Sequence, residues 1–152
     1  MKILFSLVLT AAAATGIYAA TNEVDVIPNI DGHIAKLTSE SQKTGSAFET
    51  VRKYGNHLIM IAHREGPGSV EWHEHDTDIF LVLDGNATLV TGGKIVGGKT
   101  TAPGEIRGTS IQGGQSQKIG KGDIVHINPK TPHQLQVQKG TKFDYFVVKV
   151  NQ

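Results

Sequence analysis

The feature that most constrains the fold is a series of short segments in which apolar and polar residues alternate. From Phe48 onward the apolar residues recur with a period of two, which is typical of half-buried β-strands. Glycine-containing turns separate these segments, and short strands at this spacing favour an antiparallel sandwich or barrel over alternating helices and strands. The strands expected from the pattern are residues 57–63, 69–75, 78–83, 87–91, 123–127, 133–138 and 143–150.

Two segments depart from this alternation. Within residues 21–47, which are mostly polar, Ile30, Ile34 and Leu37 are spaced as one face of a short helix. Residues 92–120 are rich in glycine, threonine and serine, and an insertion of this length is usually functional or mobile. It can cover the barrel mouth, dock a partner subunit or have no chemical role. The expected division is an N-terminal extension at 21–56 and a barrel domain at 57–152 that carries the insertion 92–120.

The N-terminal segment has the layout of a secretory signal peptide. A positive start at Met1-Lys2 precedes an apolar stretch, and small residues lead to Ala19 and Ala20, after which cleavage is expected. The alternative is an uncleaved membrane anchor, but the apolar stretch is short and interrupted for a span of about 20 residues. Residues 1–20 are therefore predicted to be a signal peptide of a secreted or periplasmic protein, with no membrane attachment after cleavage.

Composition excludes several classes of function. The chain has 15 basic and 14 acidic side chains, and this balance argues against nucleic acid as a partner. It contains no cysteine, which excludes disulfides, thiolate nucleophiles and cysteine-type zinc sites. The glycine pairs lack the strand-turn-helix setting that a phosphate-binding loop needs. The seven histidines are therefore the main candidates for chemistry.

Two histidine segments have the pattern of a metal site. His73 and His75 are two residues apart in an expected strand, so they project to one face about 6 to 7 Å apart and can bind one ion. His133 alternates with glutamines and shares its face with Leu135 and Val137, so it points to the apolar interior. A hydrogen-bonded core histidine is the alternative for His133, and the His-x-His pair elsewhere in the chain favours a ligand.

These segments resemble the two conserved motifs of the cupin superfamily. Residues 66–85, GPGSVEWHEHDTDIFLVLDG, are similar to the first, which runs from a glycine to His-x-His, an acidic residue, six residues and a closing glycine. Residues 122–133, GDIVHINPKTPH, are similar to the second, which ends in a third metal-binding histidine. The resemblance covers roughly residues 57–150. It implies an all-β fold, the cupin double-stranded β-helix or jelly-roll-like barrel, with a short N-terminal helical or irregular segment.

The resemblance also implies one divalent transition metal held by His73, His75, Asp78 and His133. These ligand types do not choose among Mn, Fe, Ni, Cu and Zn. Asp78 departs from the family pattern, because glutamate usually stands three or four residues beyond the histidine pair, whereas two residues separate His75 from Asp78. The alternative for Asp78 is a turn acid that accepts hydrogen bonds from backbone amides.

The resemblance leaves two functions open. Open coordination positions on the metal can bind water or a substrate oxygen, which implies a dioxygenase, isomerase, decarboxylase or lyase acting on a small polar molecule. The alternative is a non-catalytic cupin that binds a metal or a small ligand such as a sugar or organic acid. Because cupin barrels commonly pair, a homodimer is expected.

Other side chains are candidates for a ligand cavity, each with a simpler structural interpretation. Glu71 has the strand parity of His73 and can reach the pocket edge as an acid or base, although an exposed carboxylate at a strand start is preferred. Tyr145 and Phe143 share a face, where core packing is the simpler interpretation, as it is for His63. The residues that can contact an anionic ligand if their loops fold over the mouth, or else remain solvated, are Arg64, Lys99, Glu105 and Arg107.

Overall fold

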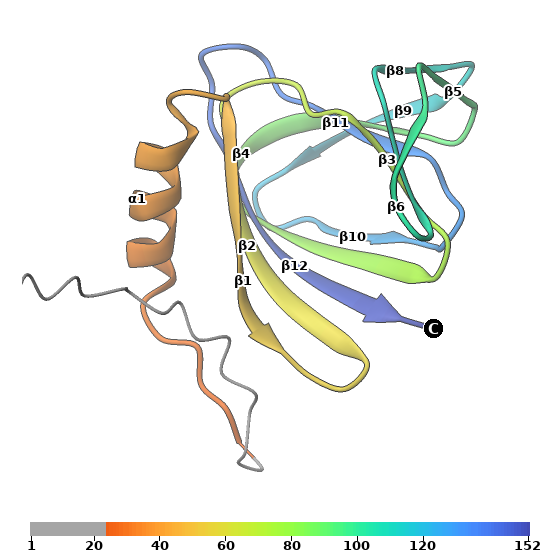
Figure 1. Cartoon of the computed structure of the whole chain (residues 1–152). Helices are drawn as coiled ribbons and strands as arrows, with labels where there is room; N and C mark the ends of the chain where they lie inside the picture. Colours follow the sequence, from red (N-terminus) through yellow and green to blue (C-terminus); the bar gives the residue numbers. More distant parts are fainter. Residues whose placement is uncertain (1–23) are drawn as a thin grey trace, which may run out of the picture.

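The structure, a computed structural model, describes residues 24–152, and the predicted signal peptide at 1–20 lies outside the described residues. The strands form a curled antiparallel sheet with one helix beside it (Figure 1). No helix in the described part of the chain is long and apolar enough to span a membrane. The elements are α1 (Ile30–Ser41), β1 (Ser46–Lys53), β2 (His57–Arg64), β3 (Val70–His73), β4 (Asp76–Thr91), β5 (Lys94–Val96), β6 (Lys99–Ala102), β7 (Glu105–Gly108), β8 (Ser110–Gln112), β9 (Gln115–Gly120), β10 (Ile124–Ile127), β11 (His133–Gln136) and β12 (Phe143–Asn151).

The long strand β4 joins the two walls of the curled sheet. The strand order is β1-β2-β12-β4-β11-β3-β7-β6, and β9 and β10 also pair with β4. The first part of β4 pairs with β12 and β10, and its last part pairs with β11 and β9. A strand that passes from one wall to the other lets residues of both walls face one interior.

Gly85 lies beside an irregularity in the pairing of β4 with β12. The sequence predicts a turn between strands 78–83 and 87–91, whereas the structure has one continuous strand through this position. Gly85 has φ 81°, and the β4–β12 register shifts between Asp144 and Tyr145. Leu83 is the extra residue at this shift, so β4 has a β-bulge there, which can bend a strand without reversing it, and Gly85 with its positive φ lies two residues beyond it.

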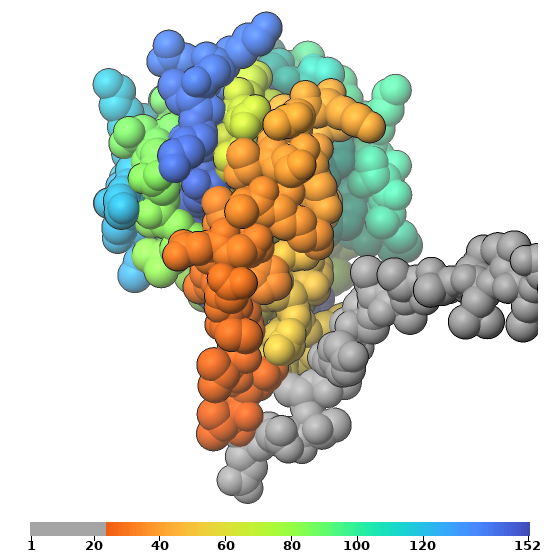
Figure 2. Space-filling model, turned by 90° about the vertical axis from the view of Figure 1, so that its left-hand side faces the viewer, coloured from red at the N-terminus to blue at the C-terminus, as the bar shows by residue number. Residues whose placement is uncertain are grey.

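Apolar packing lies on both faces of the sheet. Inside the curled sheet the core includes Phe143, which is fully buried, and Val82, which is 2 % exposed. On the opposite face of β2, α1 brings Leu37 against the sheet, and both Leu37 and Ile61 have no exposed surface. Figure 2 shows α1, in orange, on the outside of the molecule next to β1. The short helix expected from the spacing of Ile34 and Leu37 is therefore confirmed.

The structure gives defined elements to the two segments that lack a clear apolar pattern. β1 lies within residues 21–56, the expected N-terminal extension, and pairs with β2 along its length. The sheet is therefore wider than the expected barrel range 57–152. Residues 92–120 contain β5 to β9, of which β9 pairs with β4 and β7 pairs with β3.

A buried polar contact stabilises the packing of α1. His63 is 1 % exposed, and its Nδ1 lies 2.5 Å from Asp144 Oδ1 and 3.5 Å from Thr38 Oγ1 of α1. The Asp144→Ala variant is expected to lower the free energy of unfolding by about 2 kcal/mol, because buried His63 loses the shortest of its contacts. Urea denaturation measures this change. Exposed Asp84, which pairs with Lys142, provides the control, and an equal loss in Asp84→Ala would contradict the assignment.

Candidate metal centre

Three of the four predicted ligands meet inside the curled sheet. His73 ends β3 and His133 begins the adjacent strand β11, and their ring centroids are 5.3 Å apart. The Nε2 atoms of both rings lie 3.3 Å from the same oxygen, Oδ2 of Asp78. All three residues are 3 % exposed. Two imidazole nitrogens and a carboxylate oxygen thus converge in a buried place.

The opposite sides of the two rings are held by protein groups. His73 Nδ1 lies 2.7 Å from Glu105 Oε2, and His133 Nδ1 lies 3.0 Å from the backbone oxygen of Thr131. Both acceptors favour a hydrogen on Nδ1, which leaves Nε2 free to bind a metal. The two Nε2 atoms are buried and make no hydrogen bond within the described residues. This donor set fits a divalent cation.

Glu71 is the fourth group of the cluster. It lies two residues before His73 on β3, so the two side chains share one face of the strand. Its Oε2 lies 3.5 Å from His73 Nε2. One ligand atom each of Glu71, His73 and His133 fall within 4.8 Å of one another. Glu71, His73, Asp78 and His133 form the candidate metal site, and we call these four residues the metal cluster.

The structure does not bring His75 into the metal cluster. β3 ends at His73 and β4 begins at Asp76, so the strand alternation that places His75 beside His73 does not reach it. Its side chain is 61 % exposed, and its Nε2 lies 3.7 Å from Glu74 Oε2. The sequence contained a signal against His75, because only two residues separate it from Asp78 and the family pattern has three or four. Four residues separate His73 from Asp78, which matches the family spacing when Glu71 and His73 form the pair.

Asp78 is held by a lysine on the neighbouring strand. Lys149 of β12 is its partner in register, and Lys149 Nζ donates to Asp78 Oδ1 at 2.6 Å. This contact occupies one oxygen and leaves Oδ2 for the histidines. The alternative of a turn acid bonded to backbone amides does not agree with these contacts.

The charges of the metal cluster are strongly coupled. Burial by itself would raise the pKa of Glu71, but His73 and the charges of Arg107, His133 and Arg64 lower it to about 2. Burial would also raise the pKa of Asp78, but the two histidines and Lys149 hold it well below its usual range.

The pKa of His73 is shifted in the opposite direction. Burial would lower it, but contact with Asp78 and Glu71 outweighs this effect and raises the pKa to about 9. Because the pKa values of Glu71 and Asp78 are lowered, both carboxylates are anionic at neutral pH. When no metal is bound, a proton on His73 offsets the negative charge of the two carboxylates. A metal ion and this proton therefore compete for the same nitrogen.

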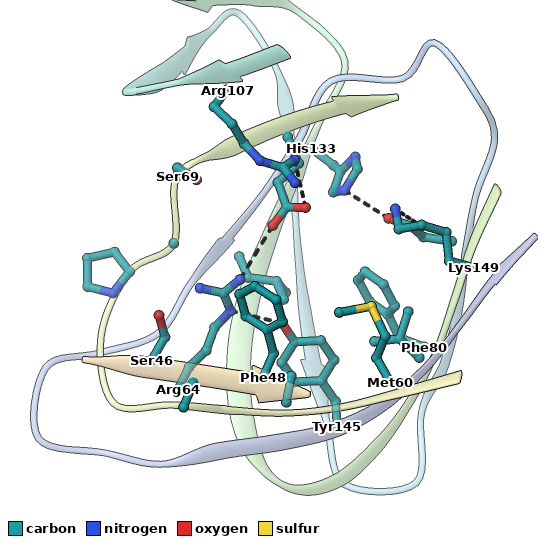
Figure 3. A pocket seen from close by; sticks show the side chains of 18 of the residues that line it. Ser46, Phe48, Met60, Arg64, Ser69, Phe80, Arg107, His133, Tyr145 and Lys149 are labelled. Carbon is teal, nitrogen blue, oxygen red and sulfur yellow. Dashed lines mark hydrogen bonds and ion pairs between the residues drawn. The ribbon is translucent and has the colours of Figure 1, made fainter. Parts of the chain in front are cut away.

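The metal cluster opens onto a cavity of about 410 Å³. Its polar lining combines Glu71, Asp78 and His133 with Arg64 of β2 and Tyr145 of β12. Figure 3 shows His133, Arg64 and Tyr145 around the cavity. The apolar lining comes from the interior faces of several strands. These apolar residues include Met60, Ala62, Phe80, Leu135 and Val147. A cavity of this size and character is typical of small-molecule sites.

The insertion 92–120 contributes directly to the site. The pairing of β3 with β7 sets His73 opposite Glu105 and Glu71 opposite Arg107. Arg107 Nη1 lies 2.9 Å from Glu71 Oε2. Lys99 is exposed on β6 and is not part of the cavity lining. The segment 92–120 thus places two charged side chains beside the metal cluster, a position that none of the three interpretations had specified. Cover of the barrel mouth and docking of a partner subunit stay predictions.

The contact between Glu105 and His73 leads to a prediction. Glu105→Gln removes the anionic acceptor that orients the His73 ring, so divalent-metal affinity is expected to fall by about 10- to 100-fold. Titration calorimetry with Zn²⁺ measures the change. Glu74→Gln, at an exposed carboxylate beside His75, is the matched control and should bind as the wild type does. Equal affinity for the wild type and Glu105→Gln would contradict this role.

Comparisons with known proteins support the fold. Neither family models nor curated protein sequences match the chain. One similar solved structure is an uncharacterized conserved protein with a double-stranded β-helix domain from Klebsiella pneumoniae. Its TM-score is 0.61 at 15 % identity, and the match covers 84 % of this chain and 91 % of that one.

Two further structures have the same architecture. The polyketide cyclase RemF from Streptomyces resistomycificus has a TM-score of 0.51 at 15 % identity, with 72 % of this chain and 67 % of that chain covered. The Cnp3 cupin domain of Schizosaccharomyces pombe has a TM-score of 0.55 at 7 % identity, with 72 % and 66 % covered. The chain therefore has the cupin fold, the double-stranded β-helix that its two sequence motifs predict.

Proposed function

We propose that this protein is an exported, metal-dependent cupin enzyme that acts on a small polar molecule at the metal cluster. The observation that carries the proposal is the pair of buried Nε2 atoms of His73 and His133. Both face the Asp78 carboxylate, His73 also faces that of Glu71, and neither makes a hydrogen bond within the described residues. Apart from these carboxylates, the two nitrogens have no partner among the described residues, and a divalent metal binds imidazole nitrogens and carboxylate oxygens together.

The donor set is suited to a divalent transition metal. Imidazole and carboxylate ligands together bind Mn, Fe, Ni, Cu or Zn, and their types do not select one of these. When bound, such an ion polarises a substrate oxygen or lowers the pKa of a water molecule. The surrounding residues fix the ligands, since Glu105, Thr131 and Lys149 each hold one of them.

An enzymatic role is supported by the cavity beside the metal cluster and by the existence of enzymes with this fold, including the polyketide cyclase named above. The proposal covers four reaction types, namely those of a dioxygenase, an isomerase, a decarboxylase and a lyase. One observation favours a non-catalytic binding protein as a second candidate. The carboxylates that line the cavity, Glu71 and Asp78, are both paired with cations, which leaves no free general base among them.

The decisive experiment is elemental analysis of protein purified from its own compartment without added metal. One divalent ion per chain is expected, and protein that binds no ion before or after incubation with these metals would contradict the proposal. Oxygen-uptake assays and a panel of sugars, phenols and keto acids then separate the two candidates. Absence of turnover by the metal-loaded protein would favour the binding role.

Export and pairing belong to the same proposal and have separate tests. N-terminal sequencing of the purified protein is expected to show that it begins directly after residue 19 or 20. Light scattering is expected to give the mass of a homodimer. An intact N-terminus would contradict export with cleavage, and a monomeric mass would contradict pairing.

A further inference from the structure

We propose that Arg64 and Tyr145 form a subsite for the carboxylate group of a small organic acid. The inference rests on the proposed function, because the subsite lies in the cavity that the metal cluster shares. It adds the chemical class of the ligand, an organic anion with an apolar body.

Arg64 presents unused hydrogen-bond donors to the cavity. It is mostly buried, with 13 % of its side chain exposed, and it lines the cavity. Its Nε donates to Tyr145 Oη at 2.9 Å, and its Nη2 makes a long contact of 3.4 Å with Glu71 Oε1. A guanidinium carries five N–H groups, so the other three donate to no described residue.

The phenol of Tyr145 adds a further donor. Because its oxygen accepts the hydrogen bond from Arg64, its own hydrogen is free to point elsewhere. Burial raises the pKa of Tyr145, so the phenol keeps this hydrogen at neutral pH. Figure 3 shows Arg64 and Tyr145 next to each other on one side of the cavity, with His133 on another side. A carboxylate can accept hydrogen bonds from both residues.

The backbone at Gly68 lies close to the guanidinium of Arg64. A Cβ at position 68 would lie 2.8 Å from Arg64 Nη1 and 3.1 Å from Cζ. The φ angle of Gly68 is not in the positive region, so its backbone does not require glycine. The lack of a side chain at position 68 therefore leaves space for the guanidinium of Arg64, which a methyl group would displace.

The charge of the cavity favours an anion over a neutral ligand. Three cationic side chains and two carboxylates line it. Glu71 lies between Arg64 and Arg107, while Asp78 is paired with Lys149. A divalent ion on the metal cluster would make the cavity more positive still. A carboxylate offsets this charge and fills the unused donors, whereas a sugar hydroxyl fills the donors alone.

The test compares acids with their neutral amides. Acetate, pyruvate, succinate and benzoate are titrated by calorimetry against full-length protein depleted of divalent ions, beside acetamide, pyruvamide, succinamide and benzamide. At least one acid is expected to bind at least about tenfold more tightly than its amide. Hydrogen bonds to a charged group raise binding affinity by roughly 10- to 100-fold. The preference should disappear in Arg64→Gln.

Arg52→Gln is the matched control, since Arg52 pairs with Asp25 away from the cavity and the variant should keep the preference. Two results would overturn the proposal: no acid preferred by the wild type, or a preference that persists in Arg64→Gln. If Arg64→Gln does not fold, Gly68→Ala decides, because the displaced guanidinium should bind the acid several-fold more weakly and unchanged binding would overturn the proposal.

The use of metal-depleted protein separates this inference from the proposed function. Carboxylate binding is measured there in the absence of the metal, and metal content is measured on the wild type in the absence of the acids. The titrations are repeated on metal-loaded protein, where Arg64→Gln is again expected to lose the preference. Failure of the acid titrations with normal metal content would reject only the subsite.

Discussion

The His133→Ala variant is expected to lose divalent-metal binding and to keep its fold. In the proposed site His133 is one of the two nitrogen ligands, and its Nε2 is 3.3 Å from the carboxylate oxygen that His73 also faces. Loss of a direct ligand should cost more than loss of a group that only orients one, so the expected decrease in affinity is at least about 100-fold. Calorimetric titration with Zn²⁺ and Mn²⁺ measures it, and circular dichroism reports the fold.

Two further variants make this result specific. Glu71→Gln should also weaken metal binding, whereas His75→Ala should bind as the wild type does, because His75 is exposed and outside the metal cluster. Full metal occupancy in His133→Ala would reject the cluster. Loss of binding in His75→Ala with normal binding in Glu71→Gln would restore the ligand set His73, His75, Asp78 and His133.

The second large effect is expected at Gly85. A Cβ on this residue would lie 2.0 Å from the backbone oxygen of Lys142, and its φ of 81° is unfavourable for other residues. Strain and steric overlap together should lower the free energy of unfolding by about 4 kcal/mol in Gly85→Ala. Urea denaturation measures the loss.

Gly140 separates the two causes of this destabilisation. Its φ of 83° is nearly the same, but nothing lies within 4 Å of a Cβ built there. Gly140→Ala should therefore show the conformational cost alone, about 1 to 2 kcal/mol. If both variants lose the same stability, the contact with Lys142 contributes nothing.

Local pattern was enough to predict much of the fold. Apolar alternation marks most of the strands from His57 onward, and two spaced motifs were sufficient to identify the cupin fold. The same motifs indicated His73, Asp78 and His133, which the structure brings together. Local rules were less informative at Gly85, since a positive φ is compatible with both a turn and a bulge.

The rest of the site depends on where strands end and on which strands pair. The sequence contains His75 in an alternating pattern, but the strand stops at His73, and Glu71 becomes the neighbour on that face. Glu105 and Arg107 lie in a segment with little apolar content, and only the pairing of β7 with β3 sets them beside the cluster. Pairing between distant segments leaves little trace in local periodicity, so neither contact could be derived from the sequence.

The pairing of β7 with β3 links metal affinity, which depends on Glu105, to ligand preference, which depends on Arg107. Successive side chains of β7 face opposite ways, so Glu105 and Arg107 lie on one face and would leave it together if the register slipped by one residue. Such a slip would remove the acceptor for the His73 ring and one positive charge of the cavity at once. A one-residue insertion or deletion before β7 can therefore change metal affinity and ligand preference jointly, without altering any ligand to the metal.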